Sequence, residues 1–211
     1  MTSAGSLSGF AADAAAALTS TSTRWSITDA PMYVPARPGL YAFFGDEQAY
    51  QDLDIVSDAH PSASLDLPLY IGKAGKSFVS RDLGDHFAAL PDSIARTGGS
   101  TVRRSFAALL RDELDLHSVP RSLKNPGYFS MYGLAGDGDA KLTAWMHARL
   151  TLAVWPRPEG MRTPLVDVET ELIRRFTPVI NLDKNPKKLA RLKAARKAMS
   201  AEARAWQPVS D

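Results

Sequence analysis

The chain has 211 residues, with 25 Lys and Arg, 23 Asp and Glu, 45% hydrophobic residues and no cysteine. This length predicts one domain, with or without a small appendage, and the absence of cysteine excludes a disulfide-stapled module and a cysteine-ligated zinc site. The net charge of +2 is unevenly divided, because residues 184–206 hold eight basic residues and one acid, against 17 basic and 22 acidic residues elsewhere. A basic C-terminal segment after an acidic body indicates a polyanion, an acidic partner or a solvated tail.

The first 35 residues are predicted to form a partly helical extension. A helix is expected near 10–18, followed by a Ser/Thr-rich connector at 19–23. The segment lacks the basic start and the apolar core of a signal peptide, and no later segment approaches the ~20 apolar residues of a membrane helix. We therefore expect a cytoplasmic protein that does not contact membranes.

Two apolar runs predict neighbouring strands. The run 40–44 lies between Pro38-Gly39 and Gly45-Asp46, as expected for a buried strand. The run 67–72 contains Pro68, which restricts it to a sheet edge or a strand start. Apolar residues at spacings of three and four then predict helices, and shorter apolar runs predict further strands. These further elements are helices at 78–90, 100–116, 137–150 and 164–176, and strands at 128–134 and 151–155.

These elements predict an α/β (α+β) fold with a small, three-stranded, mainly antiparallel sheet flanked by helices. We expect the domain to cover residues 36–185. Residues 186–211 would then form a basic C-terminal helix or tail, with Leu189, Leu192, Ala195 and Met199 as its apolar stripe.

Each of the first two strands presents a tyrosine close to a glycine: Gly39-Leu40-Tyr41 and Tyr70-Ile71-Gly72. Glycine in a strand lets a ligand or another backbone approach closely, and a phenol can hydrogen-bond a phosphate or a water. Each tripeptide alone is weak evidence, because tyrosines are also common as core aromatics of a sheet.

In its order and spacing, the chain resembles the GIY-YIG nuclease family. The resemblance continues from the two tripeptides through Lys73, Arg81 and His86 to the run from Glu169 to Asn181, and it covers about 36–185. Leucine replaces the isoleucine of the first tripeptide, a harmless change in a buried strand. The gap of about 25 residues between the tripeptides is longer than the family's hairpin, which implies an insertion at 46–66.

The resemblance implies a metal-dependent endonuclease that hydrolyses phosphodiester bonds in DNA by attack of an activated water. One divalent cation, Mg²⁺ or Mn²⁺, would be bound by Glu169 and would stabilise the phosphoryl charge together with Arg81. Glu169 lies twelve residues before Asn181, as the family's pattern requires. Glu171 is the alternative metal ligand, but it lies about 200° around the helix from Glu169.

The resemblance also implies that Tyr41 or Tyr70 accepts or relays the proton of the water, and the sequence leaves the choice between them open. His86 follows Arg81 by five residues where the family more usually has four, so the helical face of His86 is open too. It is expected to contact a phosphate or base, and the alternative is a partly buried helix histidine.

Nucleic acid is the expected partner, with DNA favoured over RNA, and no feature of the sequence indicates an oligomeric state. Hydroxyls and arginines at the start of the helix 100–116 predict phosphate contacts, because the first turn of a helix has unpaired amides. The basic tail predicts binding through counterion release. The expected nucleic-acid contacts are Lys73, Ser100, Arg103, Arg104, Asn181, Lys187 and Lys188. Two alternatives are a catalytically silent nucleic-acid-binding module and a protein adaptor that uses the basic tail.

Overall fold

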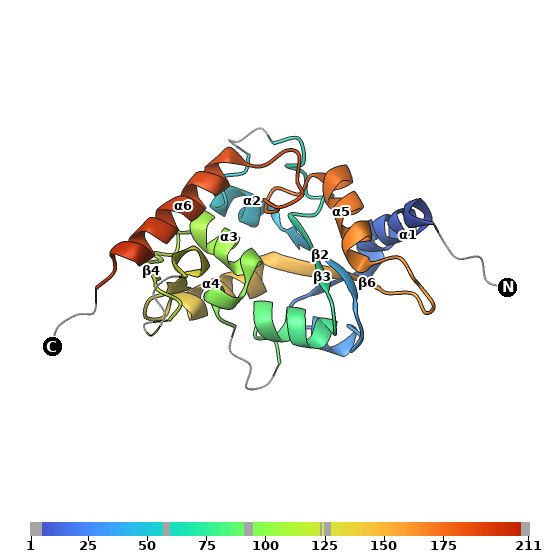
Figure 1. Ribbon diagram of the computed structural model, residues 1–211, viewed down its shortest axis with the longest axis horizontal. Helices are drawn as coiled ribbons and strands as arrows, with labels where there is room; N and C mark the ends of the chain where they lie inside the picture. Colours follow the sequence, from blue (N-terminus) through green and yellow to red (C-terminus); the bar gives the residue numbers. More distant parts are fainter. Residues whose placement is uncertain (1–5, 57–59, 91–94, 123, 125–127, 208–211) are drawn as a thin grey trace.

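The computed structural model describes residues 6–56, 60–90, 95–122, 124 and 128–207. Its centre is a four-stranded antiparallel sheet in the order β1-β6-β2-β3, with helices on both faces (Figure 1). The strands are β1 (Arg24–Ser26), β2 (Gly39–Gly45), β3 (Tyr70–Ala74) and β6 (Leu150–Pro156). The predicted fold class is confirmed, and β1 adds a fourth strand to the three expected.

Strand β2 divides the hydrophobic core into two layers, because successive side chains of a strand point to opposite faces. Leu40, Ala42 and Phe44 pack in the layer formed with helices α1 (Leu7–Thr19) and α5 (Leu165–Phe176). Tyr41 and Phe43 lie in the other layer, with α3 (Thr101–Leu109) and α4 (Gly138–Arg149). The first motif tyrosine therefore points away from α5.

Smaller elements complete the described chain. Within the expected insertion at 46–66, the Asp46 side chain accepts a hydrogen bond from the Ala49 amide at 2.7 Å and caps a short helix. The strand expected at 128–134 is reduced to two residues, which pair with β4 in a second sheet. These elements are α2 (Glu47–Asp52), β4 (Ser118–Val119), β5 (Gly133–Leu134), η1 (Thr21–Thr23), η2 (Ala30–Met32), η3 (Val79–His86), η4 (Thr97–Gly99) and η5 (Phe129–Met131).

The basic C-terminal segment forms α6 (Ala190–Ala205), which packs on the body of the protein. Leu192 and Met199 are fully buried in the same core layer as Tyr41. Glu202, the one acid among residues 184–206, accepts hydrogen bonds from the Ser118 amide at 3.1 Å and from its hydroxyl at 2.8 Å.

The domain limits 1–35, 36–185 and 186–211 stay predictions. Within the described residues, no helix is long and apolar enough to cross a membrane.

Candidate active site

The two motif tyrosines lie side by side over Gly72. The β2–β3 register places Tyr41 opposite Gly72, and a Cβ atom at Gly72 would lie only 2.5 Å from Oη of Tyr41 and 2.8 Å from Cε1 of Tyr70. The two ring centroids are 6.1 Å apart. Tyr41 is buried and Tyr70 is partly exposed. A glycine is therefore required here because the rings occupy the space that any side chain would need.

The segment that carries Arg81 and His86 is a π-helix, η3. Its hydrogen bonds join residues five apart, as in the 3.1 Å bond from the Phe87 amide to the Asp82 carbonyl. In a π-helix the side chains of residues five apart point in similar directions, whereas in an α-helix they point to different faces. The five-residue spacing of Arg81 and His86 therefore brings both side chains to Tyr41: His86 Nε2 lies 2.8 Å from the Tyr41 hydroxyl, and Arg81 acts on the pKa of Tyr41.

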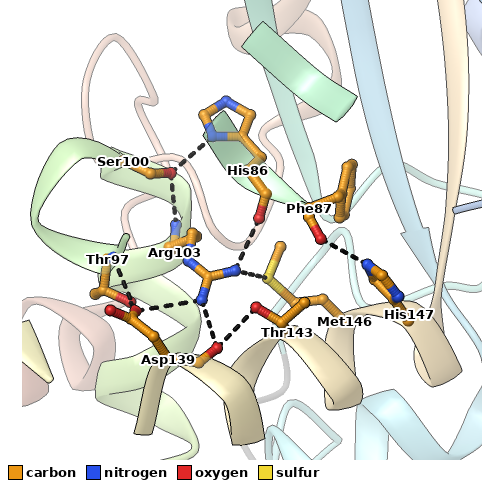
Figure 2. A network of polar contacts seen from close by, with 9 residues as sticks. All are labelled: His86, Phe87, Thr97, Ser100, Arg103, Asp139, Thr143, Met146 and His147. Atoms are coloured by element: carbon orange, nitrogen blue, oxygen red, sulfur yellow. Dashed lines mark hydrogen bonds and ion pairs between the residues drawn. The ribbon is translucent and has the colours of Figure 1, made fainter. Parts of the chain in front are cut away.

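The other ring nitrogen of His86 contacts the start of α3. Nδ1 of His86 lies 2.8 Å from Oγ of Ser100, which also accepts the Arg103 amide hydrogen at 3.2 Å and so caps the helix (Figure 2). The Arg103 guanidinium donates to the His86 carbonyl at 2.8 Å and to the Asp139 carbonyl at 2.9 Å. His86 is thus fixed on both its ring and its backbone.

Ser100 and Arg103 have internal partners in the structure. Both side chains are fully buried and their polar atoms bind inside the protein, and their contact with nucleic acid stays a prediction. Asn181 has an internal role as well: its side-chain Oδ1 accepts the Ile71 amide hydrogen at 2.9 Å and its Nδ2 donates to the Ile71 carbonyl at 2.8 Å. Asn181 therefore closes the outer edge of β3 as a neighbouring strand would.

Burial favours the neutral forms of three groups in this site: the imidazole of His86 and the phenols of Tyr41 and Tyr70. Burial, with Arg81 and Arg103 adding to it, lowers the pKa of His86 well below its usual 6.5. Burial, followed by Tyr70, raises the pKa of Tyr41 well above 10. Burial and the Glu169 carboxylate raise the pKa of Tyr70 to about 12. At neutral pH the site therefore holds a neutral imidazole beside two protonated phenols.

Arg81 is the cation of this group. Burial lowers its pKa, but Tyr41 and Tyr70 more than offset that effect, so the pKa of Arg81 is raised. Its ion pair with Asp85 measures 3.4 Å and is open to solvent, with side-chain exposures of 38% and 60%. Such exposed pairs are weak, so the guanidinium is available to an anion that reaches Tyr70.

Glu169 on α5 approaches the tyrosines from the other side of the β3 edge. It is 8% exposed and contributes to the raised pKa of both Tyr41 and Tyr70. Its Oε2 lies 2.6 Å from Nζ of Lys184. Glu171 is exposed and borders a surface hollow with the start of α1, so Glu169 alone approaches the tyrosines.

The sequence model of the GIY-YIG catalytic domain matches residues 39–198. The chain belongs to this family. GIY-YIG membership implies a nuclease-type phosphodiesterase, a hydrolase with a nucleic-acid substrate. Searches of curated proteins and of solved structures give no match.

GIY-YIG domains typically use a divalent metal. Among the described residues no three His, Cys, Asp or Glu side chains gather as a metal-binding cluster. Mg²⁺ commonly binds through one or two carboxylates, waters and substrate phosphates, so the single carboxylate of Glu169 is sufficient for it. A structural zinc site would need a fuller set of protein ligands.

Two further residues, Lys184 and Asp82, contact or approach these side chains and were not predicted from the sequence. Lys184, whose φ of 61° is left-handed, binds Glu169 but looked like part of the basic tail. Asp82 is fully buried; in the described structure neither of its carboxylate oxygens has a hydrogen-bond partner, and Oδ1 lies 4.0 Å from His86 Nε2. Burial raises the pKa of Asp82 well above its usual value. Only the three-dimensional packing around Tyr41 identifies Asp82.

The remaining predicted nucleic-acid contacts lie apart from the tyrosines. Lys73 is exposed and lies on the opposite face of β3 from Tyr70, since side chains alternate along the strand. Lys187 and Lys188 are exposed beside His60, whose Nε2 lies 2.7 Å from the Lys187 carbonyl. Arg104 is 7% exposed and donates to the Gly98 carbonyl at 2.7 Å. The contacts of the three lysines with nucleic acid stay predictions, whereas the guanidinium of Arg104 is largely enclosed.

A groove of about 430 Å³ begins at Tyr70 and runs between α3, η5 and α6. It is bordered by the polypeptide that follows α5 and by the basic face of α6. Its lining residues are Tyr70, Thr101, Ser105, Ser130, Ile180, Asn181, Leu182, Asp183, Lys193, Arg196, Lys197 and Ser200. The positive charge of the C-terminal segment was predicted from the sequence, but the groove beside it was not.

Proposed function

We propose that the protein is a metal-dependent endonuclease that hydrolyses phosphodiester bonds in DNA by attack of a water molecule. The observation that carries this proposal is the convergence of Arg81 and His86 on the Tyr41 hydroxyl, beside Tyr70 and the Glu169 carboxylate. Acid–base groups, a cation and a carboxylate are the components that phosphodiester hydrolysis requires.

Arg81 binds the scissile phosphate in this mechanism. Its solvent-open pair with Asp85 at 3.4 Å is easily exchanged for two phosphate oxygens, which a guanidinium binds in bidentate fashion. A cation fixed in advance stabilises the negative charge that builds on the phosphoryl oxygens. Tyr70, partly exposed at the mouth of the groove, contacts the same phosphate or the attacking water.

The proton of the attacking water passes to the tyrosine pair and then to His86. The high pKa of Tyr41 means that its hydroxyl keeps its proton at neutral pH, so Tyr41 acts as a base only if it gives up that proton as it receives another. In the tautomer whose Nδ1 proton is donated to Ser100, Nε2 of His86 accepts the Tyr41 proton across 2.8 Å only transiently, because burial, Arg81 and Arg103 hold the pKa of His86 well below 6.5.

Glu169 would hold the divalent cation, which supplies Lewis-acid polarisation of the phosphate when bound. Lys184 holds Glu169 by an ion pair of 2.6 Å.

The test is cleavage of plasmid and single-stranded DNA with Mg²⁺ or Mn²⁺ by the wild type, Glu169→Gln and Glu171→Gln. Glu171 is the matched control because it is exposed on the same helix and two residues away. We expect the wild type and E171Q to cleave at similar rates and E169Q to lose at least about 10²-fold, the order of effect expected for lost transition-state charge stabilisation.

Three outcomes would contradict the proposal. Equal cleavage by E169Q and the wild type would remove Glu169 from the mechanism. Background cleavage by all three proteins would favour the catalytically silent binding module. Faster cleavage of RNA of the same sequence would replace DNA as the substrate.

A further inference from the structure

Helix α6 presents a row of cations to the groove that starts at Tyr70. Lys193, Arg196 and Lys197 line it at positions three and four apart, so they share one face of the helix. Leu192 and Met199, on the adjacent face of α6, are fully buried. The basic face is therefore held rigidly against the body next to the candidate catalytic residues.

These cations lack anionic partners. Within the described residues, no ion pair joins Lys193, Arg196 or Lys197 to a carboxylate. Arg196 donates only to the Ser105 hydroxyl, at 3.2 Å. Asp183 is the one acid in the groove lining. Unpaired cations at short spacing repel one another, which favours binding of an anion between them.

A further cation lies near this row. Burial lowers the pKa of Arg104 to about 10, and the positive charges of Arg196 and Arg121 add to that effect. The ε nitrogen of Arg104 is buried and has no hydrogen-bond partner in the described structure. Arg104 thus contributes a positive field to the groove, although its own guanidinium is enclosed.

The rest of the groove has both polar and apolar surface. Thr101 contributes an exposed hydroxyl from α3, and Leu182 contributes a partly exposed apolar side chain from the segment after α5. Hydroxyls and cations suit a phosphate group, and apolar side chains suit the carbon face of a pentose ring. A strand of nucleic acid has these two components in alternation.

We propose that the groove between α3 and α6 is a binding subsite for the sugar-phosphate backbone next to the scissile phosphate. This inference rests on the proposed nuclease function, because Tyr70 is the point at which the groove meets the candidate catalytic residues. The phosphate of the flanking nucleotide binds Lys193 and Lys197, and its pentose packs on Leu182. The groove therefore directs the substrate strand past Tyr70.

The test compares two charge-matched double variants, K193Q/K197Q in the groove and R162Q/R174Q elsewhere. Arg162 and Arg174 are exposed residues of the loop before α5 and of α5 itself, and neither lines the groove. Binding of a fluorescein-labelled DNA oligonucleotide is followed by anisotropy over a series of salt concentrations, in EDTA so that no cleavage occurs. Cleavage kinetics with Mg²⁺ are measured in parallel.

We expect the slope of log K against log salt to fall by roughly 1.4 for K193Q/K197Q on single-stranded DNA, from about 0.7 for each lost phosphate contact. The same variant should raise KM by about tenfold with a smaller change in kcat. The control variant should keep the wild-type slope and KM.

Two results would overturn the subsite. One is a slope for K193Q/K197Q equal to that of R162Q/R174Q, which would reduce the effect to net charge. The other is loss of kcat with unchanged KM and slope. Failure of the proposed function is distinguishable, since it appears as absent cleavage by the wild type, whereas the anisotropy comparison needs no catalysis.

Discussion

Gly72 is the position at which a single methyl group tests the tyrosine pair. Its backbone φ is not among the positive values of the described chain, so alanine adopts the same conformation without strain. The added Cβ would nevertheless lie 2.5 Å from both Oη and Cζ of Tyr41, where ordinary contact begins near 3.4 Å. Gly72→Ala therefore forces Tyr41 and Tyr70 to move.

The required movement is on the order of 1 Å, a displacement that costs about 10²-fold in rate when it misplaces a catalytic group. Tyr41 cannot yield freely because its ring is buried and its hydroxyl binds His86 at 2.8 Å. Overpacking of this kind costs about 1–3 kcal/mol. For a chain of this size each kcal/mol lowers Tm by about 2–4 °C, so we expect G72A to melt about 2–12 °C below the wild type.

The assay is DNA cleavage by G72A and by Gly75→Ala, with circular dichroism melting of both. Gly75 is the matched control, because it lies directly after β3 and a Cβ there would have no atom within 4 Å. We expect G75A to cleave like the wild type and G72A to lose about 10²-fold. A folded G72A with wild-type cleavage would refute the placement of the two tyrosines in the mechanism.

Three further predictions concern the residues that hold the site and α6. Ser100→Ala removes both a helix cap and the contact to His86 Nδ1. We expect the free energy of unfolding to fall by about 1 kcal/mol and the cleavage rate to fall by more than this loss of stability explains. Unchanged cleavage would argue against a role of His86 in proton transfer. Arg103→Met removes the hydrogen bonds to the His86 and Asp139 carbonyls. The free energy of unfolding measured in urea should fall by about 2–4 kcal/mol, and a fall below about 1 kcal/mol would contradict the internal role of Arg103. Glu202→Gln should lower Tm at neutral pH by about 2–4 °C. Although burial opposes it, hydrogen bonding to Ser118 lowers the pKa of Glu202 in the folded state. The stabilisation is therefore complete above the unfolded value near 4.5 and is lost as the pH falls through the folded value. The Tm difference between E202Q and the wild type should therefore shrink as the pH falls through the folded pKa of Glu202. A Tm difference that is constant from pH 7 to pH 3 would contradict this role of Glu202.

The two strands and their tyrosines were predictable because local pattern determines them. An apolar run between Pro38-Gly39 and Gly45 can form little other than a buried strand, and Gly72 opposite Tyr41 follows from pairing two such strands. Strand β1 was missed because three residues, Arg-Trp-Ser, carry no alternating pattern; β1 exists because it pairs with the edge of β6. Elements stabilised by a neighbour instead of their own pattern leave no signal in the sequence.

The internal contacts of Ser100 and Arg103 were not predictable for a related reason. A hydroxyl and an arginine in the first turn of a helix suit a phosphate equally well whether that turn faces solvent or the core. The packing of α3 against η3 decides between the two, and it places the Arg103 guanidinium on the His86 carbonyl at 2.8 Å. The residue types can be read from the sequence, but the side of the helix that is buried cannot.

The charge of the C-terminal segment has a more specific meaning in the fold than in the sequence. A free basic tail would add affinity for any polyanion through counterion release alone. In the structure, Leu192 and Met199 anchor α6 in the core that contains Tyr41, so Lys193 and Lys197 keep a fixed distance from the candidate site. A cation fixed relative to the reacting groups adds positioning of the substrate to simple attraction. The division of the chain into an acidic body and a basic end therefore corresponds to one surface on which the basic helix borders the tyrosines.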